Sequence, residues 1–298
     1  MSGTTRPAPA DFRKRFADGE QLVGTFIKTP TSHAIEILGD IGYDFVVIDE
    51  EHAPFDRNSI DVGLLAARAA GTAGIVRVAA PTAANILSVL DCGAIGVLVP
   101  HVSSAAKAGE IVSACRYRGG RRGYSASPRA GRYGGASMAQ HIEAQDKTIT
   151  VIAMIEDPEA LDEIDAIAAV EGLDGFFIGR GDLTVAFGAP GCDAPAVRDA
   201  VERITKAARK VNKPVCVMVG GVAEAKPFRE LGASAFIVST DQGFLRRAAS
   251  QALTDMATLK ALYDLDNDGE AQDEGAGPQT RGRTVRCRCM THPIRARR

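Results

Sequence analysis

The sequence predicts a closed (β/α)₈ barrel, or TIM barrel, in which eight parallel strands alternate with helices. Short apolar, β-branched runs recur eight times between residues 22 and 263, and a helical pattern follows each of them. Such alternation implies right-handed βαβ units and a parallel sheet. Eight units in this length suit a closed barrel better than a doubly wound sheet. No Gly-x-Gly-x-x-Gly follows the first run, so a dinucleotide-binding fold gains no support.

The elements follow one another in a regular order. The apolar runs predict strands at 22–27, 45–48, 74–78, 95–100, 149–155, 174–179, 214–219 and 235–239. The intervening segments predict helices at 32–41, 59–70, 83–91, 103–117, 158–170, 195–211, 222–231 and 244–263. Asp157 and Pro158 suit the N-cap and first position of a helix. Residues 118–147 are a long polar segment to which no element is assigned.

Three regions are predicted along the chain. Residues 1–15 are expected to be a flexible N-terminal segment, residues 16–263 the barrel, and residues 264–298 a disordered tail that is first acidic and then rich in arginine. The tail begins with Asp264-Leu-Asp-Asn-Asp-Gly269, which imitates a calcium loop. The twelfth position of that pattern is Gly275 and not glutamate, which argues against calcium binding.

Composition excludes several classes of protein. The chain is 45% apolar and 24% charged with a net charge of −2, which is typical of a globular protein and not of a dedicated nucleic-acid binder. No apolar run is long enough to span a bilayer, and the N-terminus has no secretory pattern. The six cysteines are scattered, so reduced thiols are expected. We therefore expect a cytoplasmic protein.

The second predicted strand ends in an unusual group of polar residues. In parallel α/β enzymes the carboxyl ends of the strands carry the chemistry. Here Asp49, Glu50, Glu51 and His52 follow the apolar run. Asp49 stands three residues before His52, so its carboxylate could orient the imidazole of a general base. The alternative is a turn histidine without catalytic role, and the sequence indicates no role for Glu50.

Other strand ends contribute further candidates. Arg77 interrupts an apolar run, so its charge must meet a partner or a wet cavity. Glu156 and Asp182 follow neighbouring strands and suit a hard divalent cation that keeps several waters. The alternative for Glu156 is a helix-start carboxylate. Gly179 and Gly181 form a strand-to-helix turn whose N–H groups could approach an anion.

These residues resemble the HpcH/HpaI aldolase/citrate lyase family, which includes metal-dependent class II pyruvate aldolases. The resemblance covers residues 22–253, and its motifs occur in the same order and with similar spacing. They are Ile48-Asp-Glu-Glu-His-Ala-Pro54, Val76-Arg-Val78, Leu98-Val-Pro100, Arg122-Gly123, Ile155-Glu156 and Gly179 to Leu183.

The resemblance implies roles for particular residues. It implies that Glu156 and Asp182 bind a divalent cation (Mg²⁺, Mn²⁺ or Co²⁺) that the ketoacid also chelates. Backbone N–H groups at Gly181 and Asp182 would hold the ketoacid carboxylate, Arg77 would stabilise the enolate oxygen, and an Asp49–His52 pair would move protons at the aldol hydroxyl. It also implies a homo-oligomer, usually a hexamer built as a trimer of dimers that exchange the last helix.

The implied activity is reversible cleavage of 2-keto-4-hydroxy acids to an aldehyde and pyruvate, or a pyruvate analogue such as hydroxypyruvate. The enolate charge requires a Lewis acid and a fixed cation. A Schiff-base route would need a lysine at a strand end, and Lys28 lacks a matching context. The alternatives are citrate-lyase-like cleavage of a coenzyme A thioester and a catalytically silent barrel that binds ketoacids.

Some positions depart from the family pattern. The family often has glycine at Glu50, glutamine at Met154 and methionine at His101, and its Gly-Pro-Ala-Asp turn is Gly-Arg-Gly-Asp here. These changes surround the expected pocket, so the aldehyde is not predicted. The segment 118–135 is basic and is expected either to make structural or subunit contacts or to bind an anionic substrate; its arginines are Arg118, Arg121, Arg122, Arg129 and Arg132.

Overall fold

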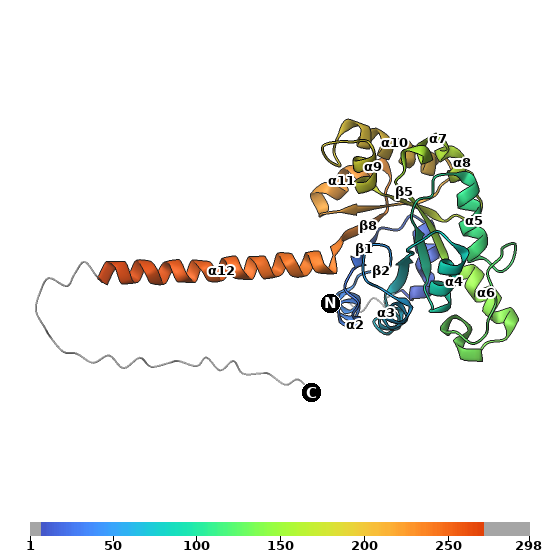
Figure 1. Cartoon of the computed structure of the whole chain (residues 1–298), viewed down its shortest axis with the longest axis horizontal. Coiled ribbons are helices and arrows are strands. Elements are labelled where there is room, and N and C mark those ends of the chain that lie inside the picture. The colour runs from blue at the N-terminus through green and yellow to red at the C-terminus, as the bar shows by residue number, and fades with distance from the viewer. Residues whose placement is uncertain (1–6, 271–298) are drawn as a thin grey trace, which may run out of the picture. The chain divides into compact units, whose positions relative to one another are not determined.

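A computed structural model describes residues 7–270 and shows eight parallel strands closed into a barrel (Figure 1). Each strand pairs with the next in the chain, and β8 pairs with β1. The predicted fold class is confirmed. The strands are β1 (Leu22–Ile27), β2 (Phe45–Asp49), β3 (Ala73–Arg77), β4 (Gly96–Val99), β5 (Thr150–Ile155), β6 (Gly175–Ile178), β7 (Val215–Val219) and β8 (Ala235–Thr240).

The helices from α2 to α11 lie around the outside of the strands (Figure 1). The helical elements of the described chain are η1 (Pro9–Asp11), α1 (Phe12–Ala17), α2 (Ser32–Ile41), α3 (Arg57–Ala69), α4 (Ala83–Asp91), α5 (Ala105–Cys115), η2 (Arg129–Gly134), α6 (Met138–Thr148), α7 (Pro158–Asp162), α8 (Ile164–Ala169), α9 (Arg180–Ala186), α10 (Pro195–Lys210), α11 (Val222–Leu231) and α12 (Asp241–Glu270). The expected helix 158–170 is divided at Glu163 into α7 and α8.

The polar segment after α5 contains a helix that the sequence prediction did not assign. The helix α6 begins at a capping box in which Ser137 and Gln140 satisfy each other's backbone N–H groups. Ser-x-x-Gln is a recognised start signal. The weak amphipathic pattern after it, with only His141 fully buried, explains why periodicity did not identify the helix.

The barrel interior is filled by side chains that alternate along each strand. Residues at every second position point inward, as with Phe45 and Val47 on β2. The N-terminal end of this interior core contains Phe12 and Phe16 of α1, which are 2% and 1% exposed. Residues 9–15, expected to belong to a flexible segment, form η1 and the start of α1, and α1 buries two aromatic side chains under the barrel.

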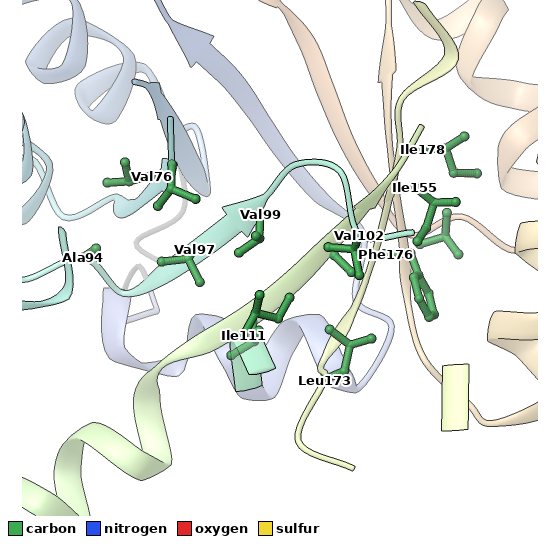
Figure 2. Packing of buried hydrophobic residues seen from close by; sticks show 14 of the residues in the cluster. Val76, Ala94, Val97, Val99, Val102, Ile111, Ile155, Leu173, Phe176 and Ile178 are labelled. Atoms are coloured by element: carbon green, nitrogen blue, oxygen red, sulfur yellow. The ribbon is translucent and has the colours of Figure 1, made fainter. Parts of the chain in front are cut away.

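A second apolar layer lies between the strands and the helices. The alternate residues of the strands, such as Val46 and Ile48, belong to this outer cluster. Figure 2 shows its side chains from neighbouring strands, with Val97 and Val99 on β4 and Ile111 on α5. The two layers fix which side of each strand faces the interior, and so fix which residues emerge at the mouth.

The chain divides into two compact units, Met1–Arg246 and Arg247–Arg298. The second unit, as far as it is described, is the continuation of α12, which runs beyond the expected end at residue 263. The calcium-like stretch 264–269 is helical. The remainder of the expected disordered tail, residues 271–298, lies outside the described residues. Among the described helices, none combines the length and apolarity needed to cross a bilayer.

Candidate active site at the carboxyl ends of the strands

Four charged residues continue the inward-facing positions of their strands into the mouth of the barrel. On β1, Leu22 and Phe26 point inward, and two residues further is Lys28. The same count reaches Asp49 after Val47 on β2 and Arg77 after Ile75 on β3. On β5 it reaches Glu156 after Ile152 and Met154. The period of two residues thus builds a charged layer on top of an apolar barrel core.

Asp49 and Arg77 form a bidentate ion pair in this layer. Asp49 and Arg77 are paired in register. Arg77 Nε donates to Asp49 Oδ1 at 2.9 Å and Arg77 Nη2 to Oδ2 at 2.7 Å. Lys28 Nζ donates to the same Oδ2 at 2.5 Å. Burial opposes ionisation of Asp49, but Arg77 and Lys28 outweigh it and lower its pKa to about 2. Asp49 is therefore a permanent anion that fixes the guanidinium.

The expected contact between Asp49 and the His52 ring is not formed. Asp49 Oδ1 accepts a hydrogen bond from the backbone N–H of His52 at 3.2 Å. The His52 side chain is 57% exposed, and its Nε2 lies 3.9 Å from Glu51 Oε2. The i, i+3 spacing suits a turn in which the carboxylate caps the main chain, and that is the contact present. The two residues are close, but Asp49 does not orient the imidazole.

Glu51 connects the residues of the mouth, a role that the sequence prediction missed. Its Oε2 lies 3.2 Å from Arg77 Nη1, and its Oε1 lies 3.7 Å from His101 Nε2. The side chain is 12% exposed. Glu51 stands two residues beyond the end of β2, where the chain has left the sheet and strand geometry no longer fixes the direction of a side chain. Only the path of the loop brings it over the barrel.

Glu156 is a buried carboxylate held from the neighbouring strand end. Its Oε1 accepts a hydrogen bond from His101 N–H at 2.9 Å, and within the described residues Oε2 accepts none. His101 adopts a left-handed backbone with φ of 54°, which is uncommon for a residue other than glycine. The His101 ring places Nδ1 3.1 Å from Asp157 Oδ1. His101, treated as a weak candidate from sequence, is part of the site.

The electrostatics of Glu156 favour a cation. Burial, followed by the charges of Asp182 and Glu51, raises its pKa to about 7, although the His101 N–H opposes this. Asp182 stands in the first turn of α9, three residues after Gly179, and its negative charge contributes to this shift in the pKa of Glu156. The described residues contain no group of three or more His, Cys, Asp or Glu placed to hold a metal. Two carboxylates that repel each other fit a hard divalent cation whose remaining ligands are substrate and water.

The turn after β6 brings its backbone close to Glu156. A Cβ at Gly179 would lie 2.5 Å from Glu156 Cβ and 2.9 Å from Oε2, so glycine is required for this approach. A Cβ at Gly181 would meet no atom within 4 Å, which leaves this part of the turn open. Arg180 points to α11, where Nη2 donates to Glu224 Oε1 at 2.5 Å. Arg180 therefore anchors the turn.

A cavity of about 280 Å³ lies between these strand ends. Its walls include Lys28, Arg77, Gly181 and Asp182, together with apolar side chains such as Phe26. This volume suits a small organic acid. Arg77 Cζ lies 4.9 Å from the Phe26 ring centroid, so the aromatic face supports the guanidinium from below.

Two other sequence features are placed away from this cavity. Glu50 Oε2 accepts hydrogen bonds from Ala79 N–H at 3.2 Å and Asn85 Nδ2 at 2.8 Å, so it fastens the loop before α4. In the basic segment 118–135, Arg129 Nη2 donates to Asp61 Oδ2 at 2.7 Å and Nε to Cys92 O at 3.0 Å. These contacts with neighbouring helices support the structural alternative for the segment.

Together, the closed (β/α)₈ barrel and the charged residues gathered at the carboxyl ends of its strands are typical of a barrel enzyme. The chain belongs to the HpcH/HpaI aldolase/citrate lyase family, whose profile matches residues 22–248. It is 34% identical over 249 residues to proteins named 5-keto-4-deoxy-D-glucarate aldolase from Enterobacter sp. (strain 638) and Escherichia coli O6:H1. Each match covers 83% of this chain and 96% of the relative.

Solved structures agree with this assignment. A HpcH/HpaI aldolase/citrate lyase family protein from Burkholderia cenocepacia J2315 is 30% identical with a TM-score of 0.79, covering 83% of this chain and 99% of that one. A structure named citrate synthase SbnG is 33% identical with a TM-score of 0.75, covering 85% and 98% of the two chains. The predicted family is confirmed.

Proposed function

We propose that this protein is a divalent-metal-dependent aldolase that reversibly cleaves 2-keto-4-hydroxy acids to an aldehyde and pyruvate or a pyruvate analogue such as hydroxypyruvate. The observation that carries the proposal is the charged layer at the mouth: Arg77 is locked by Asp49, and it lines one cavity with Asp182 and with Gly179, the residue that lies against Glu156. Relatives named as aldolases support it.

Arg77 is proposed to bind the oxygen that becomes negative in the enolate. Its bidentate contact with Asp49 fixes the guanidinium before the substrate arrives, so little reorganisation is needed as charge develops. The open turn at Gly181 and Asp182 is proposed to receive the ketoacid carboxylate through backbone N–H groups. Burial of Arg77, whose side chain is 6% exposed, strengthens its interaction with the developing charge.

Glu156 and Asp182 are the proposed ligands of Mg²⁺, Mn²⁺ or Co²⁺. When bound, the cation would act as a Lewis acid that withdraws charge from the keto oxygen. The raised pKa of Glu156 supports this role, because a cation removes the cost of keeping its carboxylate ionised beside Asp182.

The proton at the aldol hydroxyl needs a carrier within the mouth. His52 remains the proposed base, since its side chain is 57% exposed and its ring is free of Asp49. Asp49 is proposed to position Arg77 and the His52 main chain instead of serving in a proton relay with the ring. Glu51 is the carboxylate beside the imidazole.

The test is enolate formation and carbon–carbon bond chemistry by the purified full chain. With Mg²⁺, Mn²⁺ or Co²⁺ added, we expect deuterium exchange at C3 of pyruvate, followed by NMR, and aldol products from pyruvate or hydroxypyruvate with simple aldehydes. Glu156→Gln should lower the rates of exchange and of condensation by at least about 10³-fold. The control Glu159→Gln, at an exposed residue of α7, should leave both rates unchanged. Absence of exchange and condensation across all metals would reject the proposal.

Two rivals remain testable in the same assay. The first rival is an enzyme that acts on a larger acid or on a coenzyme A thioester, and the relative named citrate synthase supports it. Inhibition by coenzyme A thioesters would favour this rival. A catalytically silent barrel would bind pyruvate in calorimetry without turnover with any metal. We further propose that the protein is a cytoplasmic homo-oligomer, a hexamer built as a trimer of dimers, with neither nucleic-acid nor membrane partners. Sedimentation can test the oligomeric state.

A further inference from the structure

Lys28 is a charged residue of the mouth that the proposed chemistry does not use. It follows β1 at the inward-facing position two residues after Phe26, so it belongs to the same layer as Asp49 and Arg77. Its side chain is 23% exposed and lines the 280 Å³ cavity. Sequence reasoning considered Lys28 only as a Schiff-base residue and found no context for it.

The structure holds Lys28 firmly in this place. Its backbone N–H donates to Asp241 Oδ1 at 2.8 Å, and the next N–H, of Thr29, donates to Asp241 Oδ2 at 3.1 Å. Its ammonium donates to Asp49 Oδ2 and lies 5.9 Å from the Phe26 ring centroid. A main chain fixed at the end of β8 and a side chain fixed at the end of β2 keep the ammonium at the cavity wall.

Lys28 keeps hydrogen-bond donors that its contacts with the protein do not use. An ammonium has three donors, and within the described residues Lys28 Nζ donates one hydrogen bond, to Asp49. Two N–H donors of a charged group therefore remain for a ligand or water.

The position of Lys28 in the barrel indicates which part of a ligand it would meet. In the closed order of eight strands, β1 lies four strands from β5 in either direction. Lys28 thus stands across the mouth from Glu156, while Lys28 and Asp182 line the same cavity. The cavity therefore gives a ketoacid whose keto end lies at Asp182 room to extend its other end towards Lys28.

We propose that Lys28 is a specificity-determining residue that binds an acidic group, a carboxylate in the simplest case, on the aldehyde half of the substrate. The inference rests on the proposed aldolase function and deepens it. Lys28 would then be the residue that favours 2-keto-4-hydroxy diacids, the class to which the keto-deoxy-glucarate of the relatives' name belongs, over the corresponding monoacids. A charge-assisted hydrogen bond at this site favours the acidic aldehyde over its neutral counterpart.

The experiment compares two aldehydes of similar size that differ in charge. Condensation of pyruvate with glyoxylate and with glycolaldehyde is measured for the wild type, Lys28→Met and Lys28→Arg, with pyruvate C3 exchange as a reaction that needs no aldehyde. We expect Lys28→Met to lower the ratio of kcat/KM for glyoxylate to that for glycolaldehyde at least ten-fold, mainly through KM, and Lys28→Arg to retain most of it. The control Lys107→Met removes a lysine of α5 paired with Glu110 and should leave the ratio unchanged.

The other outcomes are separable. If Lys28→Met lowers exchange and both condensations by the same factor, Lys28 acts only through Asp49 and Arg77, and the specificity role is overturned. If the wild type shows exchange but no preference for the charged aldehyde, the role is likewise overturned. If the wild type shows neither exchange nor condensation with any metal, the aldolase function itself fails and this inference with it.

Discussion

Two aspartates at opposite ends of the barrel are each held by two cations, yet their surroundings differ. Asp174 precedes β6 at the amino end, where Arg13 Nε lies 2.8 Å from its Oδ1 and Arg116 Nη2 lies 3.3 Å from its Oδ2. Asp49 ends β2 at the carboxyl end and is held by Arg77 and Lys28. The pairing chemistry is the same at both ends.

The difference lies in where the remaining donors point. Arg13 also donates to Asp146 O at 2.8 Å and Arg116 to Ile149 O at 2.9 Å, so both guanidinium groups fasten the main chain. At the mouth, Lys28 and Arg77 line a cavity instead. An ion pair whose spare donors meet main-chain carbonyls stabilises the fold, whereas one whose spare donors meet a cavity is available for a ligand. The predictions below test this distinction.

The largest expected effect is on catalysis at Arg77. Arg77→Lys keeps the charge but loses the planar fork that meets both oxygens of Asp49, so we expect turnover to fall about 10²- to 10³-fold, as for other removed transition-state donors. Arg116→Lys at the amino end should keep the turnover per folded molecule. Steady-state kinetics of both variants measure these turnover rates. Equal losses of turnover in the two variants would contradict the proposed difference between the two ends of the barrel.

The next effect is on stability at Asp174. Asp174→Asn leaves Arg13 and Arg116 without their anion, and breaking such a pair costs about 3 kcal/mol. Denaturant titration should show this loss, with the slope unchanged. Asp162→Asn, at an aspartate paired only loosely with Arg203 on the surface, is the matched control and should change stability little. An Asp174→Asn protein as stable as the wild type would contradict the proposal that these ion pairs stabilise the fold.

A smaller effect is expected in the pH dependence of metal binding. The pKa of Glu156 is raised to about 7, so protons compete with the cation below that pH. The apparent association constant should fall by about ten-fold per pH unit as the pH drops from 7 towards 5. Above pH 7 it should become constant. Calorimetry with Mn²⁺ measures it, and a flat profile from pH 5 to 8 would contradict the assignment of Glu156 as a ligand.

The smallest effect concerns His52, because its ring is exposed and unpaired with Asp49. His52→Ala should slow aldol cleavage about ten-fold, less than the 10²- to 10⁴-fold typical of general-base effects, and should slow pyruvate exchange less. His33→Ala, on an exposed part of α2, is the control. Equal losses in cleavage and exchange would show that His52 shapes the mouth and does not carry the proton.

Position at the carboxyl ends of the predicted strands supplied most of the candidate site. Counting every second residue along an apolar strand and past its end reaches Lys28, Asp49, Arg77 and Glu156 without any structure. Of these four residues, only Lys28 was given no role from the sequence. Glu51 and His101 were missed because they lie two residues beyond the ends of β2 and β4, where loop geometry replaces the period of two, whereas Lys28 and Glu156 follow their strands directly. The spacing of Asp49 and His52 predicted that the two residues lie close together but not which atoms are in contact. Asp49 accepts a hydrogen bond from the main-chain N–H of His52 and not from its ring.

The sequence by itself determined the eight βα units, the apolar interior and the charged residues at the carboxyl ends, because these depend on periodicities of 2 and 3.6 that are local. Tertiary structure alone decided that Phe12 and Phe16 join the interior core at its amino end, that Glu51 links Arg77 to His101, and that Lys28 stands across the mouth from Glu156. Such contacts join residues far apart in the chain, and they exist only once the barrel has closed.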